Sequence, residues 1–401
     1  MRESKSLPWS RRHRSRSVSL ALALTAWAPM AAAESVMDTL QVHGFLSQAL
    51  VITDDNDFFG PSSSGDGSLK YTEIGANASF RPRHDVLVAA QVLSRRAGGD
   101  GSDARPALDY GVIDYQPYSD QRRTLGIQLG RFKNPFGFYN QTRDVAFTRP
   151  SILLPQSIYF DRTRSLGLSA DGVSLYAEER MQHGTLRFTG GVGTPTTRDL
   201  DSQLYPARLG VDVNGSTSSI AQLRYEHSDG HFTAALSAAD VNLDLGLGPF
   251  EGELNFQPWI LSLQYDKERW ALTGEFALRQ VSTTATGTLP ESDVTGESWY
   301  VQYTRRFFDD WQWLVRYDNL VNDRDDRSGR AYEAQGRGPA HARYADDITL
   351  GLQWRVNPRV LVAAEYHHID GTGWLPLRDE PDPAETQRSW NMVLFQLSLR
   401  F

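Results

Sequence analysis

The sequence contains no cysteine among its 401 residues, which excludes a disulfide framework, a thiolate metal site and a cysteine nucleophile. It also lacks a hydrophobic run long enough for a transmembrane helix, because the apolar run from Val18 to Met30 is too short to span a bilayer. With 11% aromatic residues, the chain is too rich in aromatics to be disordered. Its length allows two or three soluble domains, or one large all-β or barrel unit.

Residues 1–33 are predicted to form a secretory signal peptide. A basic stretch from Arg11 to Arg16 precedes the apolar run, and Ala31-Ala32-Ala33 supplies a small-residue cleavage site before Glu34. An uncleaved membrane anchor is the alternative. Residues 34–401 carry 35 basic and 48 acidic side chains, a net charge of −13. Such an acidic exported protein is a poor candidate for binding nucleic acid.

The dominant pattern in the remaining chain is alternation of apolar and polar residues in short runs, which predicts β-strands with one apolar face. In one run Ile348, Leu350, Leu352 and Trp354 alternate with polar residues such as Thr349. Only one face of such a strand can meet an apolar medium.

Long and short connections alternate along the whole chain. Seven predicted short turns lie near residues 81–85, 117–122, 179–183, 227–230, 266–269, 306–310 and 355–359. Eight predicted long polar loops lie near residues 53–68, 94–106, 133–165, 195–217, 240–255, 281–296, 319–346 and 369–388. Fifteen connections join sixteen strands, with both termini on the side of the short turns.

This asymmetry favours a transmembrane antiparallel β-barrel over residues 34–401. Outer-membrane barrels have an even strand number, short periplasmic turns, long outer loops and aromatic girdles. We expect Tyr265, Trp270, Tyr303, Trp311, Trp313 and Trp354 to form such girdles against the lipid. A barrel of about sixteen strands leaves an aqueous channel unless something fills it. The expected location is therefore the outer membrane, with membrane lipid and lipopolysaccharide as its surroundings.

The last strand supports the same prediction. Phe395, Leu397, Leu399 and Phe401 share one face, and the printed sequence ends on Phe401. An alternating last strand with a terminal phenylalanine resembles the signal that the barrel-assembly machinery reads in Gram-negative outer-membrane proteins. An ordinary edge strand that ends in phenylalanine by chance is the alternative.

Residues 133–165 form a connection that is unusually long and apolar for a surface loop. It contains Phe136, Phe147, Leu153, Ile158 and Phe160, which we expect to pack against another part of the protein. A loop of this length without regular structure is uncommon and is usually functional.

The stretch Gly130-Arg131-Phe132-Lys133-Asn134-Pro135-Phe136-Gly137 resembles the G-x-F-K-x-P-F-G signature of the phosphate- and polyphosphate-selective porin family. Its place after the fifth strand matches that family, and Asp171 to Tyr176 resembles the porin strand that follows. The resemblance implies a homotrimeric, water-filled diffusion channel whose third loop folds inward and narrows the pore. The family's ladder of lumenal arginines cannot be assigned in this chain.

The same loop is locally cationic. Residues 133–165 contain five basic and two acidic side chains, and rings of arginine and lysine favour anions in pores. We therefore predict a pore constriction that prefers small hydrophilic anions. Its candidate solute-binding residues are Arg131, Lys133, Arg143, Asp144, Arg149, Asp161, Arg162 and Arg164. The alternative is that the arginines only anchor the loop to acidic residues of the lumen.

No motif for catalysis, a metal or a cofactor stands out, so we expect a channel without enzymatic activity or cofactors. The sequence has no Gly-x-Ser-x-Gly elbow, no His-Glu-x-x-His motif and no P-loop. Two other functions remain open: an outer-membrane hydrolase, and a plugged receptor or export component. The second would need a plug domain or partner, and no domain is evident before the first strand near Thr39.

Overall fold

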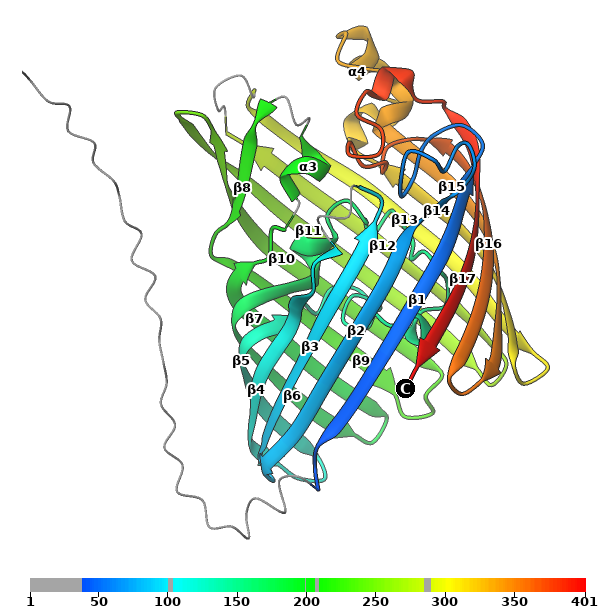
Figure 1. Cartoon of the computed structure of the whole chain (residues 1–401). Helices are drawn as coiled ribbons and strands as arrows, with labels where there is room; N and C mark the ends of the chain where they lie inside the picture. Colours follow the sequence, from blue (N-terminus) through cyan, green and yellow to red (C-terminus); the bar gives the residue numbers. More distant parts are fainter. Residues whose placement is uncertain (1–37, 100–103, 199, 206–208, 285–289) are drawn as a thin grey trace, which may run out of the picture.

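The computed structural model describes residues 38–99, 104–198, 200–205, 209–284 and 290–401. The predicted signal peptide, residues 1–33, lies outside the described residues. The described chain forms one large sheet that curls into a barrel (Figure 1). No helix in these ranges is long and apolar enough to cross a bilayer.

Seventeen β-strands build the sheet. They are β1 (Gln41–Thr53), β2 (Ser68–Arg83), β3 (Val86–Ala97), β4 (Ala107–Ser119), β5 (Arg123–Lys133), β6 (Ser169–Met181), β7 (Gly184–Pro195), β8 (Val211–Gly215), β9 (Ser218–His227), β10 (Phe232–Leu247), β11 (Phe250–Lys267), β12 (Trp270–Thr283), β13 (Ser292–Phe307), β14 (Trp311–Val321), β15 (Tyr344–Asn357), β16 (Val360–Gly371) and β17 (Ser389–Arg400).

The helices are short and lie in the long connections. They are η2 (Ala146–Thr148), α2 (Arg164–Leu168), α3 (Leu200–Leu204), η4 (Arg324–Asp326), α4 (Arg330–Ala334), η5 (Ala340–Arg343) and η6 (Pro383–Glu385).

The sheet closes because the first and last strands pair. β1 and β17 run antiparallel, with Phe45 opposite Arg400 and Thr53 opposite Met392. β8 and β9 both pair with β10, so they form one barrel strand interrupted at residues 216–217. The barrel thus has sixteen strands, all joined antiparallel, which confirms the predicted fold class. Closure pairs backbone groups that a bilayer core could not hydrate.

Side chains alternate between the two faces of the wall as predicted. On β5, Leu125, Ile127 and Leu129 point outward and are exposed, whereas Gly126 and Gln128 between them face the lumen. The outward aromatic side chains also make contact from strand to strand near the short turns. Tyr265 lies 5.7 Å from Trp270, Trp270 lies 5.9 Å from Tyr303, and Tyr303 lies 5.3 Å from Trp313, as measured between ring centroids.

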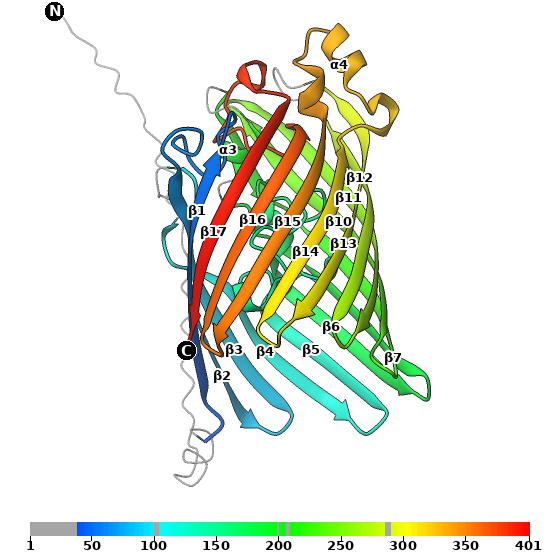
Figure 2. The same ribbon diagram turned by 90° about the vertical axis from the view of Figure 1, so that its right-hand side faces the viewer.

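The connections divide the barrel into two ends, which we call the short-turn end and the long-loop end (Figure 2). One predicted loop is wrong: residues 240–255 are strand, and a two-residue turn at 248–249 joins β10 to β11. Leu243, Leu245 and Leu247 continue the alternation of β10, and Gly248 takes the positive φ of +60° that a tight hairpin needs. The acidic and glycine residues of this segment suggested a loop, although its period of two was that of a strand.

Candidate functional site

The connection between β5 and β6, residues 134–168, turns into the barrel instead of extending from its rim. We call it L3. Both ribbon views show this segment inside the wall (Figures 1 and 2). Its Ile152, Leu153 and Ile158 are buried, which confirms that the apolar side chains pack against the protein.

Two glycines of the family-like motif allow L3 to enter. Gly130 has a φ of +117°, and a Cβ atom there would lie 2.3 Å from the carbonyl oxygen of Gly111. Gly137 has a φ of +60°, and a Cβ atom would lie 2.3 Å from the Tyr159 hydroxyl and 2.8 Å from a Glu275 carboxylate oxygen. A larger residue fits at neither position, because the backbone is both left-handed and in close contact.

Glu275 on β12 is one anchor for L3. Its carboxylate accepts hydrogen bonds from the Phe138 backbone N–H at 2.9 Å and from the Tyr159 hydroxyl at 2.7 Å. Ser262 and Tyr300 on the neighbouring strands donate to the same carboxylate at 2.5 and 2.8 Å. A buried carboxylate is stable only when such donors replace its hydration.

Glu365 on β16 and Arg316 on β14 hold the middle of L3. Glu365 accepts from the backbone N–H groups of Ile152 and Leu153, the latter at 3.1 Å. Arg316 donates to the Leu153 carbonyl oxygen at 3.2 Å. L3 is therefore fixed to the opposite side of the lumen by strands far from its own ends.

Apolar contacts support these anchors. Leu154, Ile158 and Tyr159 pack with Ile260 and Tyr300 on one side of the lumen. Ile152, Leu153 and Phe160 belong to a second cluster that includes Leu320 and Trp390. Burying side chains of this size contributes about 1.5–3 kcal/mol each, so L3 is a packed element rather than a mobile loop.

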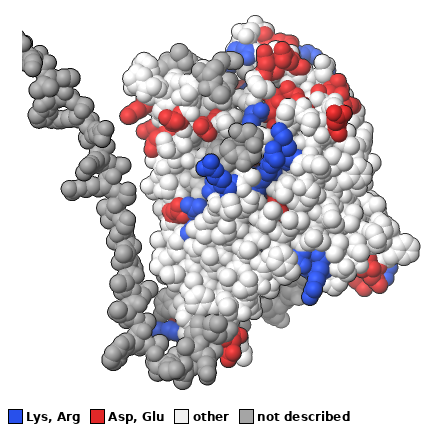
Figure 3. All heavy atoms as spheres, viewed as in Figure 1, with Lys and Arg blue, Asp and Glu red and all other residues white. Residues whose placement is uncertain are grey.

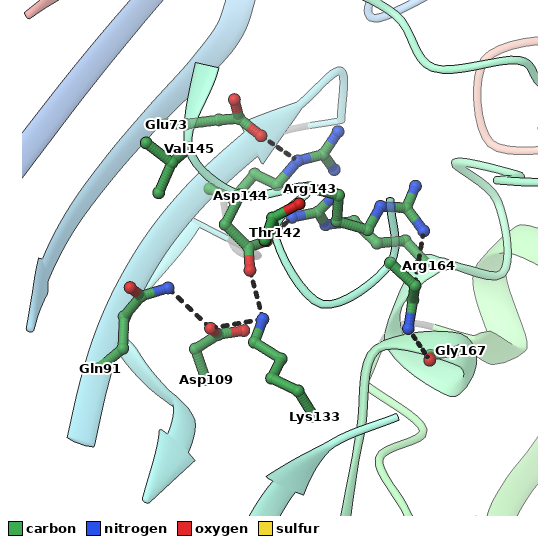
Figure 4. A network of polar contacts seen from close by, with 12 residues as sticks. Glu73, Gln91, Asp109, Lys133, Thr142, Arg143, Asp144, Val145, Arg164 and Gly167 are labelled. Carbon is green, nitrogen blue, oxygen red and sulfur yellow. Dashed lines mark hydrogen bonds and ion pairs between the residues drawn. The ribbon is translucent and has the colours of Figure 1, made fainter. Parts of the chain in front are cut away.

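Ion pairs connect L3 to the near side of the wall (Figure 4). Lys133 lies 2.6 Å from Asp109 and also pairs with Asp144, which in turn pairs with Arg164. Gln91 donates to Asp109 at 2.8 Å. These cations are compensated, so they anchor L3 and carry little field into the lumen.

A second group of ion pairs centres on Glu73 of β2. Arg149 of L3 contacts Glu73 at 3.0 Å, and Arg95 of β3 contacts it at 3.1 Å. Arg95 also contacts Asp161 of L3 at 2.5 Å. Asp161 and Arg149 thus take part in anchoring the loop.

The remaining predicted residues differ in their surroundings. Arg131 faces outward, on the same side of β5 as Leu129, and pairs with Asp171 at 2.6 Å.

Arg143 is buried without a carboxylate partner among the described residues and donates to the Tyr159 carbonyl oxygen at 3.0 Å. Burial, with Arg164 nearby, lowers the pKa of Arg143 to about 9.

Arg162 is the half-buried cation of L3 for which the described residues provide no ion pair or hydrogen bond. Its Cζ atom lies 5.3 Å from the ring centroid of Phe160, and the Cζ atom of Arg279 on β12 lies 4.7 Å from the same centroid. Burial, with Arg343 nearby, lowers the pKa of Arg162 to about 10, so it remains charged near neutral pH.

Arg279 was not among the predicted site residues. It is buried, donates to the Val321 carbonyl oxygen at 3.2 Å, and has no carboxylate partner among the described residues. The alternation places Arg279 in the lumen, but only the folded position of L3 brings it to Phe160. The neighbouring Gly296 leaves room for its guanidinium, since a Cβ atom there would lie 2.8 Å from Nη2.

The lumen between L3 and the short-turn end is open to solvent. The side chains of Arg187, Arg224 and Glu226 face inward there and are 47%, 40% and 54% exposed. L3 therefore narrows a barrel that is hydrated below it. The arginines beside it that have no carboxylate partner among the described residues include Arg143, Arg162, Arg279 and Arg316.

No protein-family model matches the chain, and no curated protein matches its sequence. Solved structures do match its fold. An anion-selective porin from Comamonas acidovorans aligns with a TM-score of 0.57 at 11% identity, covering 90% of this chain and 99% of that one. OmpF of Salmonella typhi, solved with daunomycin, gives 0.56 at 12% identity, covering 90% and 97%. OprB of Pseudomonas putida gives 0.55 at 10% identity, covering 92% and 96%. The chain therefore has the barrel fold found in these porins.

Proposed function

We propose that the chain is an outer-membrane porin through which small hydrophilic solutes diffuse passively. The observation that carries this proposal is L3, a packed loop that crosses a hydrated sixteen-stranded barrel and is anchored at Glu275 and Glu365. Such a loop restricts the size of solutes without closing the barrel at either end. The work is size exclusion and electrostatic steering, and no bond is made or broken.

The proposed anion preference rests on arginines beside L3 that have no carboxylate partner in the part of the chain that the structure describes. Arg162 and Arg279 flank Phe160, and Arg143 lies deeper in the loop. Arg149, Arg164 and Lys133 contribute less, since carboxylates neutralise them. This refines the predicted set of site residues, and phosphate selectivity is not part of the proposal.

The membrane setting and assembly are also proposals. The chain passes through the inner membrane with its signal peptide, lies in the outer membrane among lipid and lipopolysaccharide, and forms a homotrimer. Phe401 is 77% exposed, with its ring beside Gly44, and we propose that the barrel-assembly machinery binds this residue. One structure with the same fold, OmpT of Vibrio cholerae, is described in a trimer form, which supports the oligomeric state.

The reversal potential in a salt gradient tests the anion preference. We expect the protein in planar bilayers to favour chloride over potassium, and Arg162→Gln with Arg279→Gln to shift the reversal potential toward the cation value. Arg305→Gln with Arg306→Gln, near the turn after β13, removes the same charge far from L3 and serves as the control. Equal reversal potentials for the two double variants would contradict the proposed filter.

A further inference from the structure

The barrel wall has a notch at the long-loop end, between β3 and β8. β4 pairs with β3 only as far as Leu93, so Ser94–Ala97 of β3 pair with β2 alone among the described strands. β8 pairs with β10, and β7 pairs with β9 only as far as Ser218. The ends of β4 to β7 form the floor of the notch (Figure 1).

The notch holds a cavity of about 500 Å³. L3 forms its back through Asp161, Arg162 and Ser165, and the connection 196–198 borders it above β7. This volume exceeds that of an inorganic ion and lies within the usual range for small-molecule sites.

The cavity is cationic in an acidic protein. Three aspartates and six arginines line it, and the arginines are Arg95, Arg131, Arg162, Arg164, Arg198 and Arg378. The whole chain has a net charge of −8, so this local excess of positive charge opposes the overall balance. On the face shown in Figure 3, lysine and arginine atoms gather around the same region, above a broad uncharged surface.

Arg378 donates to the Ala97 carbonyl oxygen. Of the other five arginines, two have no carboxylate partner among the described residues. Asp171 binds Arg131 through two contacts of 2.6 and 2.8 Å, Asp161 binds Arg95, and Asp144 binds Arg164. Arg162 and Arg198 remain uncompensated, one from L3 and one from the connection after β7. Two guanidinium groups that line one cavity suit an anionic ligand.

The neutral lining adds further donors. Ser165, Ser169, Thr194, Thr197 and Asn214 line the cavity between the arginines. Hydroxyl and amide groups of this kind suit a hydroxylated ligand, such as a sugar, attached to the anionic group.

The notch lies directly above the apolar belt. Arg131 and Asp171 form one cross-strand pair, and Leu129 and Val173, two residues nearer the short-turn end, form another. Leu129 and Val173 point outward and are 50% and 48% exposed. A lipid whose acyl chains cover these residues would place its headgroup at the level of the notch.

We infer that the notch is a binding site for a phosphate or carboxylate group on a sugar-like ligand, held by Arg162 and Arg198. The ligand is either the headgroup of a glycolipid in the surrounding leaflet or a free sugar phosphate. The cavity is lined from both faces of the wall, by outward-facing Arg131 and Asp171 and by Arg95 and Arg162 on the lumen side. Arg162 is therefore shared with the proposed filter, whereas Arg198 belongs to the notch alone, and probe binding to Arg198→Gln can be measured whether or not the channel conducts.

Binding to the full-length chain in a neutral detergent tests the inference. The probes are lipid A, its dephosphorylated form and glucose 6-phosphate, with native mass spectrometry as the readout. We expect lipid A to bind, its dephosphorylated form to bind at least tenfold more weakly, and Arg162→Gln with Arg198→Gln to weaken lipid A binding at least tenfold. Arg122→Gln with Arg269→Gln, at the short-turn end, is the matched control and should bind as the wild type does.

The probes distinguish the sources of the anionic group. Binding of lipid A alone identifies a lipid headgroup, whereas binding of glucose 6-phosphate with the same dependence on Arg162 and Arg198 identifies a free solute. Arg198→Gln alone serves as a second variant, because its exposed side chain has no role in packing L3. The inference is overturned if neither phosphate probe binds, or if the notch and control variants bind equally. If no probe binds and the notch is buried only when the protein forms an oligomer, the inference is also overturned. The notch is then a contact surface for a second copy of the chain.

Discussion

Glu275 is the residue on which the position of L3 depends most strongly. We expect Glu275→Gln to destabilise the protein by about 2–4 kcal/mol, because an amide cannot accept from four donors and the Phe138 N–H cannot rotate away. Thermal unfolding in detergent measures the effect. Glu251→Gln, an exposed change at the end of β11, is the control. An unchanged unfolding midpoint for Glu275→Gln would mean that the carboxylate does not hold L3.

For single residues, the sequence could predict which face of a strand a charged side chain occupies. It placed Arg143, Arg149, Arg162 and Arg164 in one loop and predicted their surroundings as either a filter or an anchor. Ion pairs with Glu73 and Asp144 assign Arg149 and Arg164 to the anchor. The sequence could not select Glu275 or Arg279, because their partners in L3, Phe138 and Phe160, lie more than a hundred residues away in the chain and meet them only in the closed barrel.

At the scale of elements, the loop at residues 54–67 contacts the loop at residues 372–388, and this contact depends on Asp379. Its carboxylate accepts from the Phe59 backbone N–H at 3.0 Å, and burial raises the pKa of Asp379 to about 7 despite Arg378 nearby. Burial disfavours the carboxylate more than the Phe59 N–H favours it, so the pKa in the folded protein lies above the ordinary value. The free energy that holds the two loops folded is therefore largest below about pH 4 and falls as the pH rises toward 7.

Hydrogen exchange at the Phe59 amide measures this pH dependence. After correction for the intrinsic exchange rate, we expect protection to fall on the order of tenfold between pH 4.5 and pH 7.5. Asp379→Asn removes the titrating group and should give the same corrected protection at both values. A wild-type protection that does not change with pH would show that Asp379 stays in one protonation state.

The strands themselves were largely predictable from the period of two. The alternation of long and short connections gave the number of barrel strands. The period of two gave the outward face of β15, where Ile348, Leu350, Leu352 and Trp354 are exposed as predicted. The prediction was wrong at residues 240–255. Their charged and glycine residues were interpreted as a loop, although Leu243, Leu245 and Leu247 have the alternation of a strand. The interruption between β8 and β9 was not visible either, since it depends on pairing with β7 and β10.

Considered as a whole molecule, the barrel consists of a closed wall and a loop packed inside it. The closed ladder and the outward apolar belt fix the wall, while L3 decides how much of the lumen remains open. Solved outer-membrane proteins with 9–12% identity share this fold, so the wall tolerates extensive change in sequence. Shared fold at this identity does not give the charges around L3, which come from this chain's own side chains.

The most direct test is the single-channel conductance of the protein in planar bilayers, with and without residues 140–160. The account predicts stepwise openings for the full chain and larger steps for the deletion, because L3 occupies part of a hydrated lumen. An absence of steps in both proteins, or steps of equal size, would contradict the claim that L3 narrows an open channel.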